Sequence, residues 1–159
     1  MRVGFGFDAH RLVAGRPLIL GGCRIPFERG LEGFSDADVV AHATIDAILG
    51  AAALGDCGTH FPAGDSRYAG ADSMQLLRKA VGLLRGAGYG VANIDCTILA
   101  EAPSLAPHLD GMRTALAAAL EIDVSRCSAK AKHTEGLGFT GEGAGIAACV
   151  IAAIETTKR

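Results

Sequence analysis

The spacing of apolar residues divides the chain into strand-like and helix-like segments. Apolar residues at every second position predict strands, whereas apolar residues three or four positions apart predict helices. The expected strands cover residues 2–10, 18–20, 24–27, 91–100 and 126–134. The expected helices cover residues 35–54, 72–87 and 107–122. Since no repeat, low-complexity tract or linker interrupts this pattern, we expect one α/β domain over residues 1–159.

Two parts of this pattern depend on local signals. Ser35 is suited to act as the N-cap of the first helix, with acids in the first turn where the helix dipole favours them. Residues 55–70 are expected to form a loop. Residues 145–154 are apolar on both faces, so their length does not separate helix from strand. We favour a buried strand there, in a sheet packed between helices and a neighbouring subunit.

Composition and charge narrow the class of protein. Half of the residues are apolar and 20% are charged, and a positive mean hydropathy favours additional burial through self-association. The net charge of −2 argues against a nucleic-acid partner. Five scattered cysteines without a C-x-x-C pair are typical of reduced thiols. With no signal-peptide pattern and no apolar stretch long enough for a bilayer, we expect a cytoplasmic protein without a membrane partner.

Three residues near the N-terminus have the chemistry of a metal site. Asp8 and His10 are two positions apart on an expected strand, so their side chains share one face. His42 lies on the first helix, with Asp38 and Asp46 one turn away on either side. Two imidazoles and one carboxylate form a catalytic zinc set with an open position. The alternative is a salt-bridged pair on the strand and a hydrogen-bonded core histidine on the helix.

Metal-bound imidazoles usually donate their second ring N–H to a carboxylate. Asp46 is therefore the candidate partner of His42.

A glycine-rich segment follows the expected strand at residues 126–134. Residues 136–141 match G-x-G-x-x-G, but too little chain remains for a dinucleotide-binding unit. Five glycines in ten residues indicate close approach to a ligand, or a tight connection between strands. Glu135, just before this segment, could bind a hard divalent cation, or it could be a surface acid.

In this order, the motifs resemble those of the 2-C-methyl-D-erythritol 2,4-cyclodiphosphate synthase family of the non-mevalonate isoprenoid pathway. The resemblance runs essentially end to end. It is carried by GFGFDAH at 4–10, SDAD at 35–38 with His42 following, GAAALGD at 50–56, and TE at 134–135 with LGFTG at 137–141. The family implies a homotrimer with active sites at subunit interfaces. Each subunit would contain one mixed β-sheet with helices on one face, and the sheet faces would pack together in the trimer.

The resemblance also implies roles for individual residues. Asp8, His10 and His42 would bind zinc, or manganese or cobalt, and Glu135 would help to hold a magnesium or manganese ion on the nucleotide phosphates. The other implied substrate contacts are Asp56 and Gly58 at the methylerythritol part, Ser35 near the phosphates, and Ala100, Ala102, Pro103 and Ala131 around the cytidine. The implied reaction converts 4-diphosphocytidyl-2-C-methyl-D-erythritol 2-phosphate to the cyclic diphosphate and CMP.

Several expected substrate contacts depart from the family pattern. The departing positions are Phe34, Ala63, Ser104, Lys132, His133, Glu142 and Ala144, where the family usually has polar or charged residues of other kinds. One explanation is that Lys132 and His133 bind the substrate in place of the lost groups, and the standard activity is kept. The other is a divergent paralogue whose metal site serves another phosphorylated or nucleotide ligand, with or without turnover.

Overall fold

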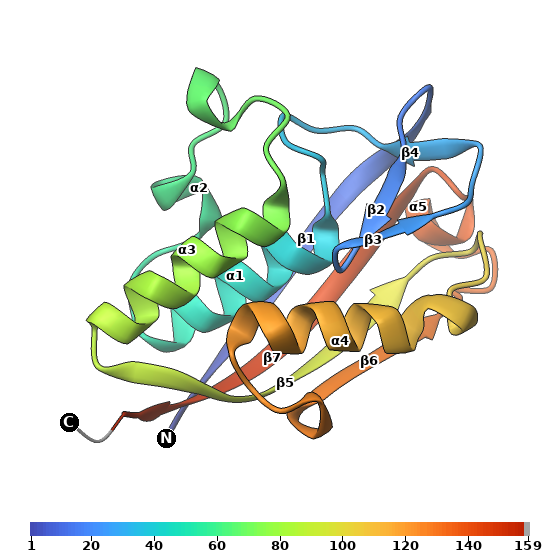
Figure 1. Ribbon diagram of the computed structural model, residues 1–159. Helices are drawn as coiled ribbons and strands as arrows, with labels where there is room; N and C mark the ends of the chain where they lie inside the picture. The colour runs from blue at the N-terminus through green and yellow to red at the C-terminus, as the bar shows by residue number, and fades with distance from the viewer. Residues whose placement is uncertain (158–159) are drawn as a thin grey trace.

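A five-stranded mixed sheet forms the framework of the computed structural model, which describes residues 1–157 (Figure 1). Its strand order is β4-β1-β7-β5-β6. Only β5 and β6 pair in parallel within the described residues; the other neighbours are antiparallel. The strand bounds are β1 Arg2–Ala14, β4 Arg29–Leu31, β5 Tyr89–Leu99, β6 Cys127–Lys132 and β7 Gly145–Thr156. Two short strands, β2 (Leu18–Leu20) and β3 (Cys23–Ile25), form a separate ribbon.

Three long helices cover one face of the sheet, as expected (Figure 1). They are α1 (Val39–Ala51), α3 (Ser73–Gly86) and α4 (Leu109–Leu120). Single turns connect the larger elements: α2 Cys57–His60, α5 Gly138–Gly141, and the 3-10 turns η1 Ser66–Tyr68, η2 Ala106–His108 and η3 Val124–Arg126. The mixed sheet with one helical layer confirms the predicted α+β arrangement of a subunit. No helix within residues 1–157 has the length and apolar character needed to span a bilayer.

The two faces of the sheet differ in what covers them. Ile94, Cys96 and Ile98 of β5 face the helices and are fully buried, which confirms the predicted alternation. On the other face, Phe5 is 62% exposed and its cross-strand partner Ile151 is 51% exposed. The segment that is apolar on both faces is therefore a strand, as predicted. Its helix-facing residues are buried in the core, and Ile151 belongs to an apolar surface on the open face.

Helix α1 lies unusually close to β1 because two strand positions lack side chains. A Cβ added at Gly4 would lie 2.0 Å from the carbonyl oxygen of Ala47, and one added at Gly6 would lie 1.9 Å from that of Ala43. Two residues along β1 advance about 6.8 Å, and one turn along α1 advances about 5.4 Å. Every second residue of β1 therefore meets α1 about one helical turn further along. Asp8 follows Gly6 on the same face of β1, and its carboxylate lies 2.9 Å from Nδ1 of His42, one position before Ala43 on α1.

Two local predictions were wrong. Helix α1 begins at Val39, and its N-cap is Asp38, whose carboxylate accepts from the N–H groups of Val40 and Ala41. Ser35 instead accepts from the N–H of Ala37 in the preceding turn. Asp38 displaces it as the cap because its carboxylate also accepts from the N–H groups of Gly21 and Gly22 and thereby joins the helix to the β2–β3 ribbon. The expected loop at 55–70 contains α2 and η1.

Candidate metal centre

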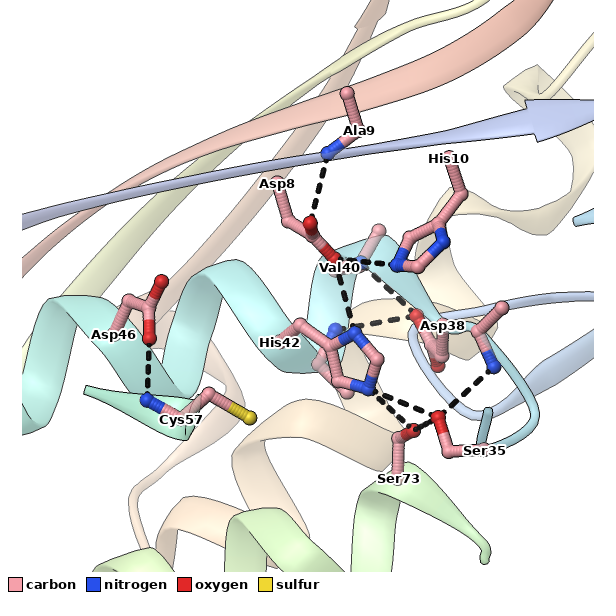
Figure 2. Close-up of polar contacts among 12 residues, drawn as sticks. Asp8, Ala9, His10, Ser35, Asp38, Val40, His42, Asp46, Cys57 and Ser73 are labelled. Atoms are coloured by element: carbon pink, nitrogen blue, oxygen red, sulfur yellow. Dashed lines mark hydrogen bonds and ion pairs between the residues drawn. The ribbon is translucent and has the colours of Figure 1, made fainter. Parts of the chain in front are cut away.

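Asp8, His10 and His42 converge where β1 passes the first turns of α1 (Figure 2). Oδ2 of Asp8 lies 3.1 Å from Nε2 of His10 and 2.9 Å from Nδ1 of His42. One possible ligand atom from each residue lies within 4.8 Å of the other two. The structure thus brings together the three residues that the sequence singled out as a metal set.

The second ring nitrogen of each histidine is held from outside this cluster. Nδ1 of His10 lies 2.5 Å from the carbonyl oxygen of Glu32. A carbonyl oxygen can only accept, so this nitrogen carries the proton and the Nε2 lone pair of a neutral His10 faces Asp8. Nε2 of His42 lies 2.9 Å from Oγ of Ser73 and 3.2 Å from Oγ of Ser35.

A neutral His10 therefore directs an acceptor lone pair at the Asp8 carboxylate, which is also an acceptor. Such a pair needs a proton or a metal cation between its atoms. Burial alone would raise the pKa of Asp8, but when the two imidazoles are protonated their hydrogen bonds and charge hold the pKa of Asp8 well below its ordinary value. The hydrogen bond to Asp8 raises the pKa of His10. Two imidazoles and a carboxylate with an open side fit a four-coordinate divalent ion of the zinc type.

Asp46 does not have the predicted contact with His42. Its carboxylate accepts from the N–H of Cys57 at 2.8 Å, while the ring nitrogens of His42 face Asp8 and the two serines (Figure 2). Helical side chains lean toward the N-terminus of their helix, which carries the His42 ring away from Asp46. Asp46 instead holds the start of α2 against α1. The serine contacts of His42 were missed by sequence reasoning, because nothing in the sequence pairs residue 73 with residue 42.

A cavity of about 210 Å³ opens beside the two histidines. Ser35 and Gly58 line it together with Phe34, Phe61, Ala63 and Tyr68. Ser35 is buried, and its hydroxyl faces His42. Asp56 lies next to this cavity as the exposed N-cap of α2 and accepts from the N–H and hydroxyl of Thr59. Of the residues expected near the phosphates and the methylerythritol part, Ser35 and Gly58 therefore line one cavity, and Asp56 lies beside it.

The residues expected around the nucleotide lie elsewhere, at the carboxyl ends of the parallel pair β5–β6. The N–H of Ala100 donates to the carbonyl of Lys132, which extends the pairing beyond β5. Ala102 and Pro103 follow on one segment, Ala131 is the last but one residue of β6, and His133 lies 4.0 Å from the Glu101 carboxylate. Glu135 is exposed. No hydrogen bond or ion pair among residues 1–157 joins this group to the triad.

The fold and the triad define a small α+β protein with a candidate divalent-metal centre. The chain belongs to the YgbB family, whose sequence model matches residues 1–155. It is 58% identical over 148 residues to 2-C-methyl-D-erythritol 2,4-cyclodiphosphate synthase of Moorella thermoacetica, covering 93% of this chain and 91% of that protein. It is 55% identical over 154 residues to the synthase of Alkaliphilus oremlandii, covering 97% and 98%.

Solved structures show the same fold. A CDP-bound form of 2C-methyl-D-erythritol-2,4-cyclodiphosphate synthase matches with a TM-score of 0.89 and 33% identity, covering 97% of this chain and all of that one. The bifunctional IspDF from Campylobacter jejuni matches with a TM-score of 0.95 and 39% identity over 99% of this chain. The present chain spans 42% of that bifunctional protein.

Proposed function

We propose that this protein converts 4-diphosphocytidyl-2-C-methyl-D-erythritol 2-phosphate to 2-C-methyl-D-erythritol 2,4-cyclodiphosphate and CMP, a phosphorus–oxygen lyase reaction. The convergence of Asp8, His10 and His42 carries the proposal, because two imidazoles and a carboxylate that face one another suit a bound cation. The high identity to named synthases supports this activity over a divergent ligand.

The reaction is an internal phosphoryl transfer. An oxygen of the substrate's 2-phosphate attacks the β-phosphorus, a new P–O bond closes the ring, and the bond from the β-phosphorus to the bridging oxygen breaks with CMP as the leaving group. Divalent ions supply neutralisation of phosphate charge and polarisation of the β-phosphoryl group when bound. The substrate provides the nucleophile, so the protein has to bind, orient and exclude water.

The proposed roles follow the placement of the residues. Asp8, His10 and His42 hold zinc, or manganese or cobalt, at the edge of the cavity beside Ser35 and Gly58. Asp56 contacts the methylerythritol part. Glu135 binds a magnesium or manganese ion on the nucleotide phosphates, and Lys132 and His133 add positive charge next to the cytidine segments. These segments are the residues expected around the nucleotide: Ala100, Ala102, Pro103 and Ala131.

We further propose a homotrimer whose active sites are shared between subunits. The exposed apolar surface on β1 and β7, which includes Val3, Phe5 and Ile151, would be covered by the other subunits. In the strand order, β1 and β6 are separated by β7 and β5, about 14 Å across the sheet. A partner's nucleotide segments would complete the site beside each triad.

Subunit mixing tests the shared site. Chains carrying His42→Ala and chains carrying Glu135→Ala should each be inactive as pure trimers. Co-expressed at equal levels, they should recover about one quarter of the wild-type activity, because one site in four receives both intact residues. Mixtures as inactive as their components would place both residues in one chain's own site.

Catalysis is tested by release of CMP from the substrate with zinc and magnesium present, followed by phosphorus NMR of the product. We expect a cyclic diphosphate signal that rises with CMP. His42→Ala should abolish it while the folded secondary structure remains. His108→Ala is the matched control, since its side chain makes no capping hydrogen bond and lies outside the triad. A folded, zinc-loaded protein without turnover would overturn the proposed activity.

A further inference from the structure

Three residues from separate parts of the chain form a hydrogen-bonded series behind the metal centre. Asp36 lies before α1, Ser73 is the first residue of α3, and His42 lies on α1. The Asp36 carboxylate accepts from both the backbone N–H of Ser73, at 3.1 Å, and the Ser73 hydroxyl. Oγ of Ser73 lies 2.9 Å from Nε2 of His42, on the side of the ring away from Asp8 (Figure 2).

Counting protons along this series favours one arrangement, in which Ser35 Oγ, 3.2 Å from Nε2 of His42 and 3.3 Å from Oγ of Ser73, directs its proton at Ser73. A hydroxyl has a single proton, and the carboxylate of Asp36 can only accept, so the Ser73 proton is directed at Asp36. Oγ of Ser73 must then accept from Nε2–H of His42. The reverse arrangement would leave a Ser73 lone pair against the carboxylate oxygen of Asp36. With its proton on Nε2, neutral His42 directs the Nδ1 lone pair at the triad.

We infer that Asp36 and Ser73 are positioning residues that fix the tautomer and ring orientation of His42, so that Nδ1 is its metal-binding nitrogen. This inference rests on the proposed metal site but not on the identity of the substrate. The orienting partner is thus a hydroxyl backed by a carboxylate, whereas His10 is oriented by the backbone carbonyl of Glu32. Ser73 and Asp36 lack direct contact with the proposed ligand position and act through His42.

The surroundings of Ser73 make this series rigid. Ser73 is fully buried, and the segments on either side of the contact are joined by backbone hydrogen bonds. The N–H of Asp36 donates to the carbonyl of Ala71 at 3.0 Å, and that of Gly70 donates to the carbonyl of Phe34 at 2.8 Å. These two backbone hydrogen bonds therefore hold both Phe34 in the cavity wall and the Asp36 carboxylate that binds Ser73.

The tautomer is read directly by nitrogen-15 NMR of histidine rings in the wild-type protein. In metal-free protein at mildly alkaline pH, where an ordinary imidazole is neutral, His42 should show Nε2–H and an unprotonated Nδ1. Added zinc should shift the Nδ1 resonance and leave Nε2–H in place. A proton on Nδ1, or zinc bound through Nε2, would overturn the inference. A protein that fails to bind zinc would fail the proposed metal site but would still report the metal-free tautomer.

Zinc affinity of Ser73→Ala, measured by competition with a chromophoric chelator, is the second test. Loss of the orienting hydroxyl should weaken binding by about 10- to 100-fold. Asp72→Ala is the matched control, because Asp72 caps α3 through the N–H of Met74 but does not touch His42. It should lower the stability of α3 and change zinc affinity less than about twofold. Equal losses in both variants, or none in Ser73→Ala, would leave Ser73 a purely structural residue.

Discussion

Replacing Gly6 with alanine tests whether the close packing of α1 on β1 builds the metal centre. The added Cβ would lie 1.9 Å from the carbonyl oxygen of Ala43, whereas ordinary contact begins at 3.4 Å. The carbonyl carbon of Ala43 and the N–H nitrogen of Ala47 would both lie 2.8 Å away. Because all three atoms belong to the helix backbone, no side-chain rotation relieves the overlap, and α1 has to move outward by about 1 Å or more.

This movement should affect stability and metal binding together. Overpacking against backbone should lower the free energy of unfolding by about 3 kcal/mol, the upper end of the usual range. His42 moves with α1, whereas Asp8 and His10 stay on β1, and metal–ligand distances tolerate only about 0.2 Å. Zinc affinity should therefore fall by at least about tenfold. Urea unfolding of the metal-free protein and chelator competition measure the two effects separately.

Gly50→Ala is the matched control on the same helix. A Cβ at Gly50 meets nothing within 4 Å, so alanine should leave zinc affinity unchanged and stabilise the protein by up to about 1 kcal/mol. Adding Ala43→Gly should not rescue Gly6→Ala, because the clashing oxygen is backbone. If Gly6→Ala unfolds within about 0.5 kcal/mol of wild type and binds zinc normally, the reasoning is refuted.

Two further predictions concern the N-cap and the open sheet face. Burial raises the pKa of Asp38 to about 6 from the ordinary 3.8. The stability that comes from this raised pKa is therefore fully present below pH 3.8 and is lost as the pH rises through about 6, by about 3 kcal/mol in all. Asp38→Asn should remove this pH dependence of the unfolding free energy, measured with urea. Phe5→Glu should dissociate the proposed trimer in light scattering, whereas Leu83→Glu, at an exposed apolar position on α3, should not; an intact Phe5→Glu trimer would contradict the proposed interface.

The sheet could be predicted because one face of each strand is buried against helices. Alternation is visible in β5, where Ile94, Cys96 and Ile98 enter the core. The helix start was misplaced because Ser35, Asp36 and Asp38 all have cap-forming side chains. What selects Asp38 is its bonds to Gly21 and Gly22, which only the folded chain brings near.

The three residues of the triad could be predicted from the sequence, but the residues that orient His42 could not. Asp8 and His10 share a strand face by simple period-two geometry, and His42 stands out as a polar residue on an apolar helix. Ser73 is 31 positions from His42, and its place after Asp72 suggests only the start of a helix. Asp46 was favoured from helical spacing alone, without the lean of the His42 ring toward Ser35.

Four of the positions that depart from the family pattern lie in two distant parts of the subunit. Phe34 and Ala63 line the cavity beside the histidines, so the polar groups lost there are lost next to the triad. Lys132 and His133 lie beyond β5 at the far side of the sheet, where His133 is 4.0 Å from Glu101. Within one subunit, these cations are therefore too far away to replace what Phe34 and Ala63 lack. In the proposed trimer they act on the same substrate where two subunits meet, so compensation at these positions depends on the proposed shared site.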